Sequence, residues 1–153
     1  MKSLLLGADD YVGRWVSYRV GAPMHAGDKT IGLLDPAQGL IAGVLYQDFN
    51  GANIVAHIAA EPGANWLNRQ FLWTIFDYPF NQLGVKRITG QVAAKNLPAR
   101  QFDEHLGFVA EATLKDALPD DDLIIYCMRR ENCRWLALKG PGYGQEILCA
   151  EDT

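Results

Sequence analysis

The sequence predicts an α+β fold with a mixed, mostly antiparallel central sheet flanked by helices. Residues 29–61 alternate runs of β-branched and aromatic side chains with short turns, which is typical of antiparallel strands. Residues 66–93 change from a helical spacing of apolar side chains to another strand, an order that brings two strands parallel. Residues 97–133 hold one more helix and a further hairpin. Helix and strand therefore alternate only in the middle of the chain, as in an α+β fold.

The N-terminal part is expected to contain one helix and three strands. The helix begins at about Asp10 and ends near Gly21, because a glycine commonly closes a helix and apolar residues precede it. The strands follow at residues 30–34, 40–49 and 53–61. Asn50-Gly51, between the second and third strands, predicts a two-residue type I′ hairpin turn.

The central helix is expected to begin at Trp66, with Asn65 as its N-cap, and to end near Gly84. Pro79 is expected to disturb its last turn, since proline lacks the N–H that a helix needs. The remaining elements are a strand at 85–93, a helix at 97–106 closed by Gly107, and strands at 108–117 and 123–133.

One domain, residues 1–153, accounts for the sequence. Its length is close to that of a typical domain, with 49% apolar and 21% charged residues, which is ordinary for a folded soluble protein. The end of the chain, residues 134–153, contains a cluster of glycines around 140–144. We expect this segment to form an irregular tail.

Charge and cysteine content argue against several classes of protein. The net charge of −4, without a basic patch, argues against a nucleic-acid partner. No stretch approaches the roughly 20 apolar residues that cross a bilayer, so neither export nor membrane insertion is expected. Three cysteines without CxxC spacing and only three histidines provide no metal-ligand cluster. This cysteine usage fits a reducing, cytoplasmic location.

A motif in the second half of the chain comprises Gly84–Ile88, Asn96, Ala99 and Gly107-Phe108. In its order and spacing this motif resembles the GNAT superfamily of acyl-CoA-dependent N-acetyltransferases. The resemblance covers roughly residues 30–133. Two further segments, Asp77–Leu83 and Cys133–Leu136, look like the compact GNAT proteins of bacteriophages and prophages.

The resemblance implies an acetyl-CoA-dependent N-acetyltransferase. Acetyl-CoA would be the acyl donor, and an amine on a small molecule or a protein would attack the thioester directly, without a covalent enzyme intermediate. The alternative is a non-catalytic module of the same fold that binds acyl-CoA or a protein. The sequence leaves the acceptor amine and the oligomeric state open.

Two positions depart from the pattern of the family. The stretch Glu61–Trp66, where the family has a phosphate-binding loop with two closely spaced glycines, contains only Gly63. Asp103 stands seven residues after Asn96, where many members place a tyrosine that protonates the leaving thiolate. We expect Asp103 to lie on a solvated helix face, which would leave that role unfilled or filled from elsewhere.

The start of the central helix is the expected cofactor-binding segment. Backbone N–H groups at a helix N-terminus bind anions, and the resemblance implies that the pyrophosphate of the cofactor lies there. The residues expected to contribute are Gly63, Asn65, Trp66, Leu67, Asn68 and Arg69. The alternative is that Asn65 only caps the helix, as any helix requires.

The strand over residues 53–61 is expected to line the thioester. Strand alternation places Ile58 and Ala60 on one face and His57 and Glu61 on the other. The resemblance implies that this strand separates from the next one at its C-terminal end, which frees backbone groups near Ile58 and Ala60 for the pantetheine arm. For Asn96, a helix cap and a contact with that arm are both expected.

His57 is the first candidate for a general base, and Glu61 is the second. An imidazole with a pKa of about 6.5 accepts a proton near neutral pH. An amine with a pKa of about 10.4 needs such help, because its deprotonation at pH 7 costs about 4.6 kcal/mol. The two side chains lie about 13 Å apart along a strand, so they cannot serve the same proton directly. The alternative for His57 is a hydrogen-bonded structural role.

Overall fold

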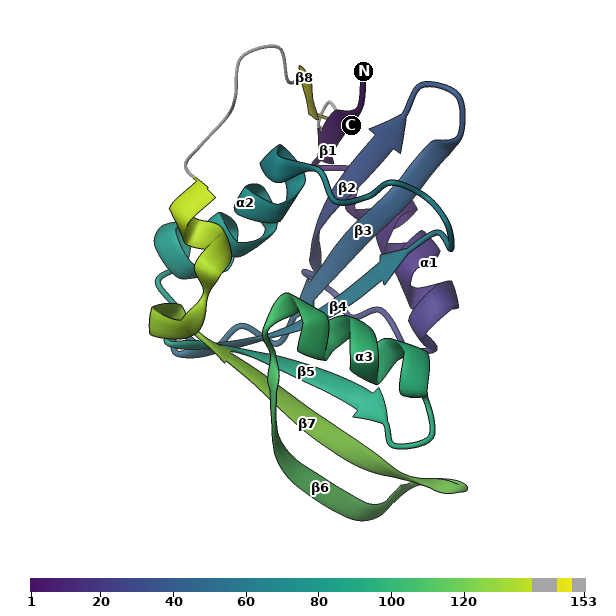
Figure 1. Ribbon diagram of the computed structural model, residues 1–153, viewed down its shortest axis with the longest axis vertical. Coiled ribbons are helices and arrows are strands. Elements are labelled where there is room, and N and C mark those ends of the chain that lie inside the picture. The colour runs from purple at the N-terminus through teal and green to yellow at the C-terminus, as the bar shows by residue number, and fades with distance from the viewer. Residues whose placement is uncertain (139–145, 150–153) are drawn as a thin grey trace.

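The computed structural model describes residues 1–138 and 146–149, which form one sheet with helices on both faces (Figure 1). The strand order across the sheet is β6-β7-β5-β4-β3-β2-β1-β8. The strands are β1 (Ser3–Leu6), β2 (Lys29–Asp35), β3 (Gly39–Gln47), β4 (Asn53–Ala60), β5 (Arg87–Ala93), β6 (Val109–Leu118), β7 (Asp121–Arg129) and β8 (Glu146–Cys149). The helices are α1 (Asp9–Val20), α2 (Arg69–Asp77) and α3 (Leu97–Leu106). Only β4·β5 and β1·β8 pair in parallel, which confirms the predicted mixed, mostly antiparallel sheet.

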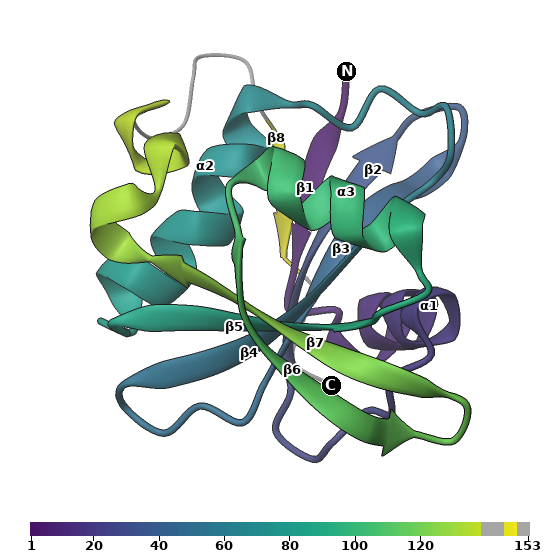
Figure 2. The same ribbon diagram turned by 60° about the horizontal axis from the view of Figure 1, so that its bottom comes forward.

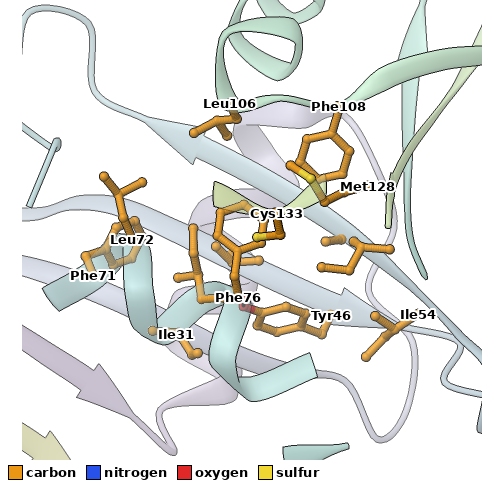
Figure 3. Close-up of a cluster of buried hydrophobic side chains, with 14 of the residues drawn as sticks. Ile31, Tyr46, Ile54, Phe71, Leu72, Phe76, Leu106, Phe108, Met128 and Cys133 are labelled. Carbon is orange, nitrogen blue, oxygen red and sulfur yellow. Dashed lines mark hydrogen bonds between the residues drawn. The ribbon is translucent and has the colours of Figure 1, made fainter. Parts of the chain in front are cut away.

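The helices cover opposite faces of the sheet. Figure 2 shows α1 and α2 on opposite sides of strands β1 to β3. The side chains buried beneath α1 are Val12, Val16, Leu40, Leu45 and Ala59. The larger cluster, between the sheet and α2 and α3, includes Ile31, Tyr46, Ile54, Phe71, Leu72, Phe76, Leu106, Phe108, Met128 and Cys133 (Figure 3). Full burial of each large apolar side chain contributes about 1.5–3 kcal/mol, so this cluster is the main core.

Pro79 converts the end of α2 into a π-helical turn over Tyr78–Gln82. Proline has no N–H to donate to the carbonyl of Ile75, four residues earlier. The buried hydroxyl of Tyr46, on β3, donates to that carbonyl instead, at 2.5 Å. The predicted disturbance at Pro79 is confirmed, and the helical path continues to Gln82 before Gly84 turns the chain with a φ of 72°.

The other predicted helices and strands agree with the structure, except that the strand predicted at 123–133 is wrong at its end, since β7 stops at Arg129 and a 3₁₀ turn over Arg130–Asn132 follows. The helix α1 ends at Gly21, and α3 ends at Gly107, both of which adopt the left-handed conformation that closes a helix. The strand-helix-strand unit from β4 to β5 supplies the predicted parallel pair. In the described part of the chain, no helix combines the length and the apolar character needed to cross a membrane.

The predicted two-residue turn at Asn50-Gly51 is wrong. The hairpin from β3 to β4 exists, but five residues, 48–52, connect its strands. The Asn50 side chain accepts hydrogen bonds from the backbone N–H groups of Ala52 and Asn53, at 2.9 and 2.8 Å. These local bonds stabilise a wider loop, which begins at Asp48 with a φ of 58°.

The predicted irregular tail is also wrong in part. Residues Arg134–Leu138 form a 3₁₀ helix, and β8 (Glu146–Cys149) pairs in parallel with β1. The strand β1 (Ser3–Leu6) was not predicted, because a run of only three leucines gives no clear period. Its backbone pairs with β2 on one side, and β8 provides hydrogen-bond partners for its backbone on the other side. The segments 139–145 and 150–153 of the expected tail lie outside the described residues.

Strands β4 and β5 separate after a short stretch of pairing. Their register contains only three pairs: Asn53↔Arg87, Ile54↔Ile88 and Val55↔Thr89. Beyond these pairs the two strands diverge, and α3 lies over the gap in the view of Figure 1. The sheet is therefore open between β4 and β5, in agreement with the expectation drawn from the family resemblance.

Candidate active site

A cavity of about 440 Å³ occupies the gap between β4 and β5. This volume lies within the usual range for small-molecule sites. Its wall is built from the end of α1, from β4 and the loop that follows, from β5 and from α3. The candidate residues that line it are His57, Ile58, Ala60, Glu61, Gly63, Trp66 and Asn96. Residues Asn65, Leu67, Asn68 and Arg69 do not belong to its wall.

The backbone of β4 presents unpaired groups to this cavity. The N–H of Glu61 donates to the carbonyl of Ile41 on β3 at 2.8 Å, so this residue points its backbone groups toward β3. Because alternate residues of a strand point to opposite edges, Ile58 and Ala60 point theirs toward β5. No β5 residue pairs with β4 beyond Val55, so these backbone groups remain available to a bound molecule.

His57 is buried on the α1 face of the sheet, with one hydrogen-bond partner for its ring among the described residues. Its Nε2 lies 3.0 Å from Oε1 of Gln47. The amide nitrogen of Gln47 donates to the carbonyl of Pro23 at 2.8 Å and to Asp28 Oδ2 at 2.7 Å. Because both of those partners are acceptors, the amide atom that faces them must be the nitrogen. The amide oxygen therefore faces His57 and accepts a hydrogen bond from its Nε2–H. The lone pair of the imidazole is therefore on Nδ1.

The charge state of His57 follows from its burial. Burial lowers the pKa of His57 below its ordinary value, while the carboxylates of Asp28 and Asp48 oppose this shift and His25 adds to it. The ring is therefore neutral at pH 7. A neutral imidazole whose Nδ1 has no partner in the part of the chain that the structure describes can accept a proton.

Glu61 is held in an ion pair. Its carboxylate accepts from the guanidinium of Arg19, and that guanidinium stacks on Trp15 at 3.7 Å from the ring centroid. Both members of the pair line the cavity. The carboxylate is therefore already engaged by a cation, which makes it a weaker candidate for a base than His57. Arg19 was not identified from the sequence, because 42 residues separate it from Glu61.

Asp103 is not on a solvated helix face, contrary to the expectation. It is partly buried and lines the cavity from α3. A methyl group added at Gly90 on β5 would lie 3.4 Å from its Oδ2, so the carboxyl is beside the point where β4 and β5 separate. Burial, with the nearby charge of Glu104, raises the pKa of Asp103 to about 7. Near neutral pH this side chain is half protonated.

A helical spacing in the sequence was the available signal for Asp103. Asn96, Ala99 and Asp103 follow each other at three and four residues, which places them on one face of α3. All three line the cavity. The high charge of residues 103–105 concealed this periodicity in the sequence.

The loop between β4 and α2 carries a row of backbone donors without partners among the described residues. Residues 61–64 form a turn in which the N–H of Ala64 donates to the carbonyl of Glu61 at 3.1 Å. Pro62 and Gly63, with a φ of 77°, occupy the central positions typical of a type II turn. The N–H groups of Ala64, Trp66 and Asn68 bond within the loop. The intervening N–H groups, at Gly63, Asn65, Leu67 and Arg69, have no acceptor among residues 1–138 and 146–149.

The N-cap prediction is wrong by three residues. The helix α2 begins at Arg69, and the side chain of Asn68 accepts from the N–H of Phe71 at 2.9 Å. Asn65 is exposed in the preceding loop. Both asparagines are good caps by residue type, and the loop bonds between residues 64 and 68 select the later one.

Several side chains of the loop contact other elements. The indole of Trp66 packs on the ring of Phe102 from α3, with centroids 4.8 Å apart, and both line the cavity. The guanidinium of Arg69 donates to the carbonyl of Leu138 at 2.8 Å, away from the cavity. The side chain of Leu67 is 55% exposed. Trp66 is therefore the loop side chain that shapes the cavity.

Asn96 has the capping role that was expected for it. Its side chain accepts from the N–H of Ala99 at 3.3 Å at the start of α3, and it also lines the cavity. Among the described residues, no group of three His, Cys, Asp or Glu side chains is close enough to hold a metal ion.

The fold is similar to that of solved N-acetyltransferases. No protein-family model matches the sequence, and no curated protein matches it in sequence. The dodecameric spermidine N-acetyltransferase of Vibrio cholerae is 16% identical, over 85% of this chain and 94% of that chain, with a TM-score of 0.65. The N-acetyltransferase PseH of Campylobacter jejuni, in complex with acetyl coenzyme A, is 14% identical over 69% of this chain and 70% of that chain, with a TM-score of 0.54. At these identities the likeness establishes the fold.

The position of the N-cap can be tested with a pair of alanine variants. Asn68→Ala should lower the free energy of unfolding by about 1 kcal/mol, because the N–H of Phe71 loses its acceptor. Asn65→Ala should change it by less than about 0.5 kcal/mol, as for other exposed loop residues. Urea unfolding monitored by circular dichroism measures both. A larger loss in Asn65→Ala than in Asn68→Ala would contradict the assignment.

Proposed function

We propose that this protein is an acetyl-CoA-dependent N-acetyltransferase that moves an acetyl group directly to an amine. The observation that carries the proposal is the opening between β4 and β5, where a cavity meets the unpaired backbone groups of Ile58 and Ala60. A free strand edge beside a cavity suits an extended chain with amide groups, such as pantetheine. The shared fold of solved N-acetyltransferases supports the same conclusion.

The loop before α2 suits the pyrophosphate of acetyl-CoA. Four N–H groups, at Gly63, Asn65, Leu67 and Arg69, have no acceptor in the described part of the chain; they alternate along the loop and lead into the N-terminus of α2. Backbone donors at a helix start bind anions without a basic side chain. A loop with one glycine would therefore be able to bind the pyrophosphate through its backbone. The side chain of Arg69 is not needed for this, since it donates to the carbonyl of Leu138. Asn96 would contact the pantetheine arm from α3.

His57 is the proposed base. In the reaction the amine nitrogen forms a bond to the acetyl carbon, and the bond from that carbon to sulfur breaks. His57 Nδ1, which has the free lone pair, takes the proton from the amine, directly or through one water. Glu61 would be the second choice, but its pairing with Arg19 opposes this role.

Asp103 is the proposed proton donor to the sulfur. The thiol of the leaving group has a pKa of about 8.5, so protonation at pH 7 is worth about 2 kcal/mol. Asp103 keeps its proton up to about pH 7 and lies at the α3 side of the opening, whereas His57 lies on the α1 face. Acid and base would thus approach the thioester from opposite faces of the sheet.

The domain organisation, the location and the class of acceptor are proposed from the sequence. Residues 1–153 would act as one domain in the cytoplasm, of the compact type found in phages, on an amine carried by a small molecule or a protein. Spermidine, the substrate in the name of one structural neighbour, is the first acceptor to test. A non-catalytic module would bind acetyl-CoA in the same cavity without turnover.

Binding of acetyl-CoA can be tested at the loop. Gly63→Ala should weaken acetyl-CoA binding at least tenfold in calorimetry, because its Cβ would enter the space beside the unpaired N–H groups. Gly27→Ala is the matched control, since both glycines have positive φ, 77° and 83°, and open space around a Cβ. Both variants should lose similar stability. The same loss of affinity in both variants, or no binding by the unmodified protein at millimolar acetyl-CoA, would contradict the proposal.

The role of His57 predicts an acidic limb in the pH profile. With saturating amine, kcat/KM for acetyl-CoA should rise with pH through an apparent pKa below 6.5, since burial lowers the pKa of His57. His57→Ala should lose about 100-fold in kcat, and with it the acidic limb, while acetyl-CoA affinity is unchanged. His105→Gln, an exposed histidine outside the cavity, is the control. An acidic limb that persists in His57→Ala would rule out His57.

The role of Asp103 predicts an alkaline limb. Activity should fall as pH rises through about 7, because Asp103 then loses the proton that it donates. Asp103→Asn should remove this limb and reduce kcat by at most about 30-fold, the factor that corresponds to 1.5 units between thiol pKa and pH. Steady-state rates from pH 5 to pH 9 measure this effect. An alkaline limb that is unaltered in a folded Asp103→Asn variant would contradict the assignment.

A further inference from the structure

Three buried polar residues form a chain that ends at His57. Asp28 precedes β2, Gln47 is the last residue of β3, and His57 is in the middle of β4. Their exposed fractions are 8%, 4% and 7%. Burial of three polar groups is unfavourable unless each is hydrogen-bonded, so this arrangement requires a specific geometry.

The register of the sheet brings Gln47 and His57 together. The pairs Leu45↔His57 and Gln47↔Val55 place the two side chains diagonally on the same face. The distance from Gln47 Oε1 to His57 Nε2 is 3.0 Å, and that from Gln47 Nε2 to Asp28 Oδ2 is 2.7 Å. The imidazole is therefore linked to a buried carboxylate through one amide.

The carboxylate is itself fixed by its own loop. The N–H of His25 donates to Asp28 Oδ2 at 2.7 Å, and the N–H of Asp28 donates back to the carbonyl of His25 at 3.3 Å. The second donation from Gln47, to the carbonyl of Pro23, anchors the amide to the same loop. The orientation of Gln47 is thus determined by the carbonyl of Pro23 and the carboxylate of Asp28, and neither contact involves His57.

From these contacts, we infer that Asp28, acting through Gln47, is a positioning residue that holds His57 as the tautomer with Nδ1 unprotonated and ready to accept a proton. The inference rests on the proposed function, in which His57 is the base. The Gln47 amide cannot relay a proton between Asp28 and His57. Instead, Asp28 and Gln47 fix the orientation of the ring, and the Asp28 carboxylate places a negative charge near the imidazolium that forms when the amine loses its proton.

The other charged groups around His57 are less able to provide this effect. Asp48 pairs with His25 at 3.2 Å, and its side chain is 59% exposed, so solvent screens its charge. Glu61, on the same strand face, is paired with Arg19 from α1. Asp103 approaches from the opposite face of the sheet and is half protonated near pH 7. Asp28 is the buried carboxylate in the hydrogen-bond chain.

Nitrogen-15 NMR of the ring nitrogens tests the inference without any acceptor amine. In the unmodified protein, His57 should carry its proton on Nε2, and protonation of Nδ1 would overturn the inference regardless of how any variant folds. Asp28→Asn keeps an oxygen for both of its donors but removes the charge. It should lower the pKa of His57 by about one unit, which is the effect of a charge a few ångströms away at an intermediate dielectric constant.

Asp48→Asn is the matched control, because it removes the same charge from an exposed position where asparagine tolerates positive φ. It should shift the pKa of His57 by less than about a third of the effect of Asp28→Asn. Equal shifts in the two variants would overturn the inference. Acetyl-CoA affinity, measured by calorimetry, should be unchanged in both, which shows that the fold and the cofactor site are intact.

The rate profile with spermidine separates this inference from the proposed function. If Asp28→Asn moves the acidic limb of kcat/KM to lower pH by the shift seen in NMR, the positioning role is supported. If the pKa of His57 moves and the acidic limb does not, His57 is not the base, and the positioning role is overturned while acetyl-CoA binding stands. If no acetyl-CoA binding is detected, the proposed function fails, and the tautomer measured by NMR still tests the hydrogen-bond chain from Asp28 through Gln47 to His57.

Discussion

The constraint on which the site depends is the short pairing between β4 and β5. Each of these strands is paired over most of its length with its other neighbour, β4 with β3 over six residue pairs and β5 with β7 over seven. Between them only three pairs form, and the two halves of the sheet then diverge. The divergence creates the cavity, leaves the backbone of Ile58 and Ala60 unpaired, and lets α3 bring Asp103 to the opening. The roles proposed for His57, Asp103 and the backbone of Ile58 and Ala60 all use this one gap.

Much of the fold could be predicted, because most elements have a local signal in the sequence. The helices α1 and α3 end at glycines, and the strands β2 to β5 carry β-branched runs bounded by turn residues. The errors occur where tertiary contacts or side-chain bonds decide the result. Asn68 caps α2 in place of Asn65 because of the bonds in the preceding loop, and Asn50 widens its hairpin with its own side chain. The short strands β1 and β8 stabilise each other by pairing, which no local pattern reveals.

The candidate site was predictable on β4 and only partly predictable elsewhere. Strand alternation correctly separates His57 from Ile58 and Ala60, and the helix cap at Asn96 is where its residue type and spacing suggest. The partners of these residues come from distant parts of the chain. Gln47 and Asp28 reach His57 through the register of β3 and β4, and Arg19 reaches Glu61 from α1. The raised pKa of Asp103 arises from burial, which the charged sequence around it does not indicate.

The most direct test of the account is a crystal structure of the protein with acetyl-CoA. The account predicts that the pantetheine arm lies along β4, with hydrogen bonds to backbone groups of Ile58 and Ala60. The thioester should lie between β4 and β5, with the pyrophosphate at the N–H groups of residues 63–69. Acetyl-CoA bound at another surface, with β4 and β5 still separated around an empty cavity, would contradict the account.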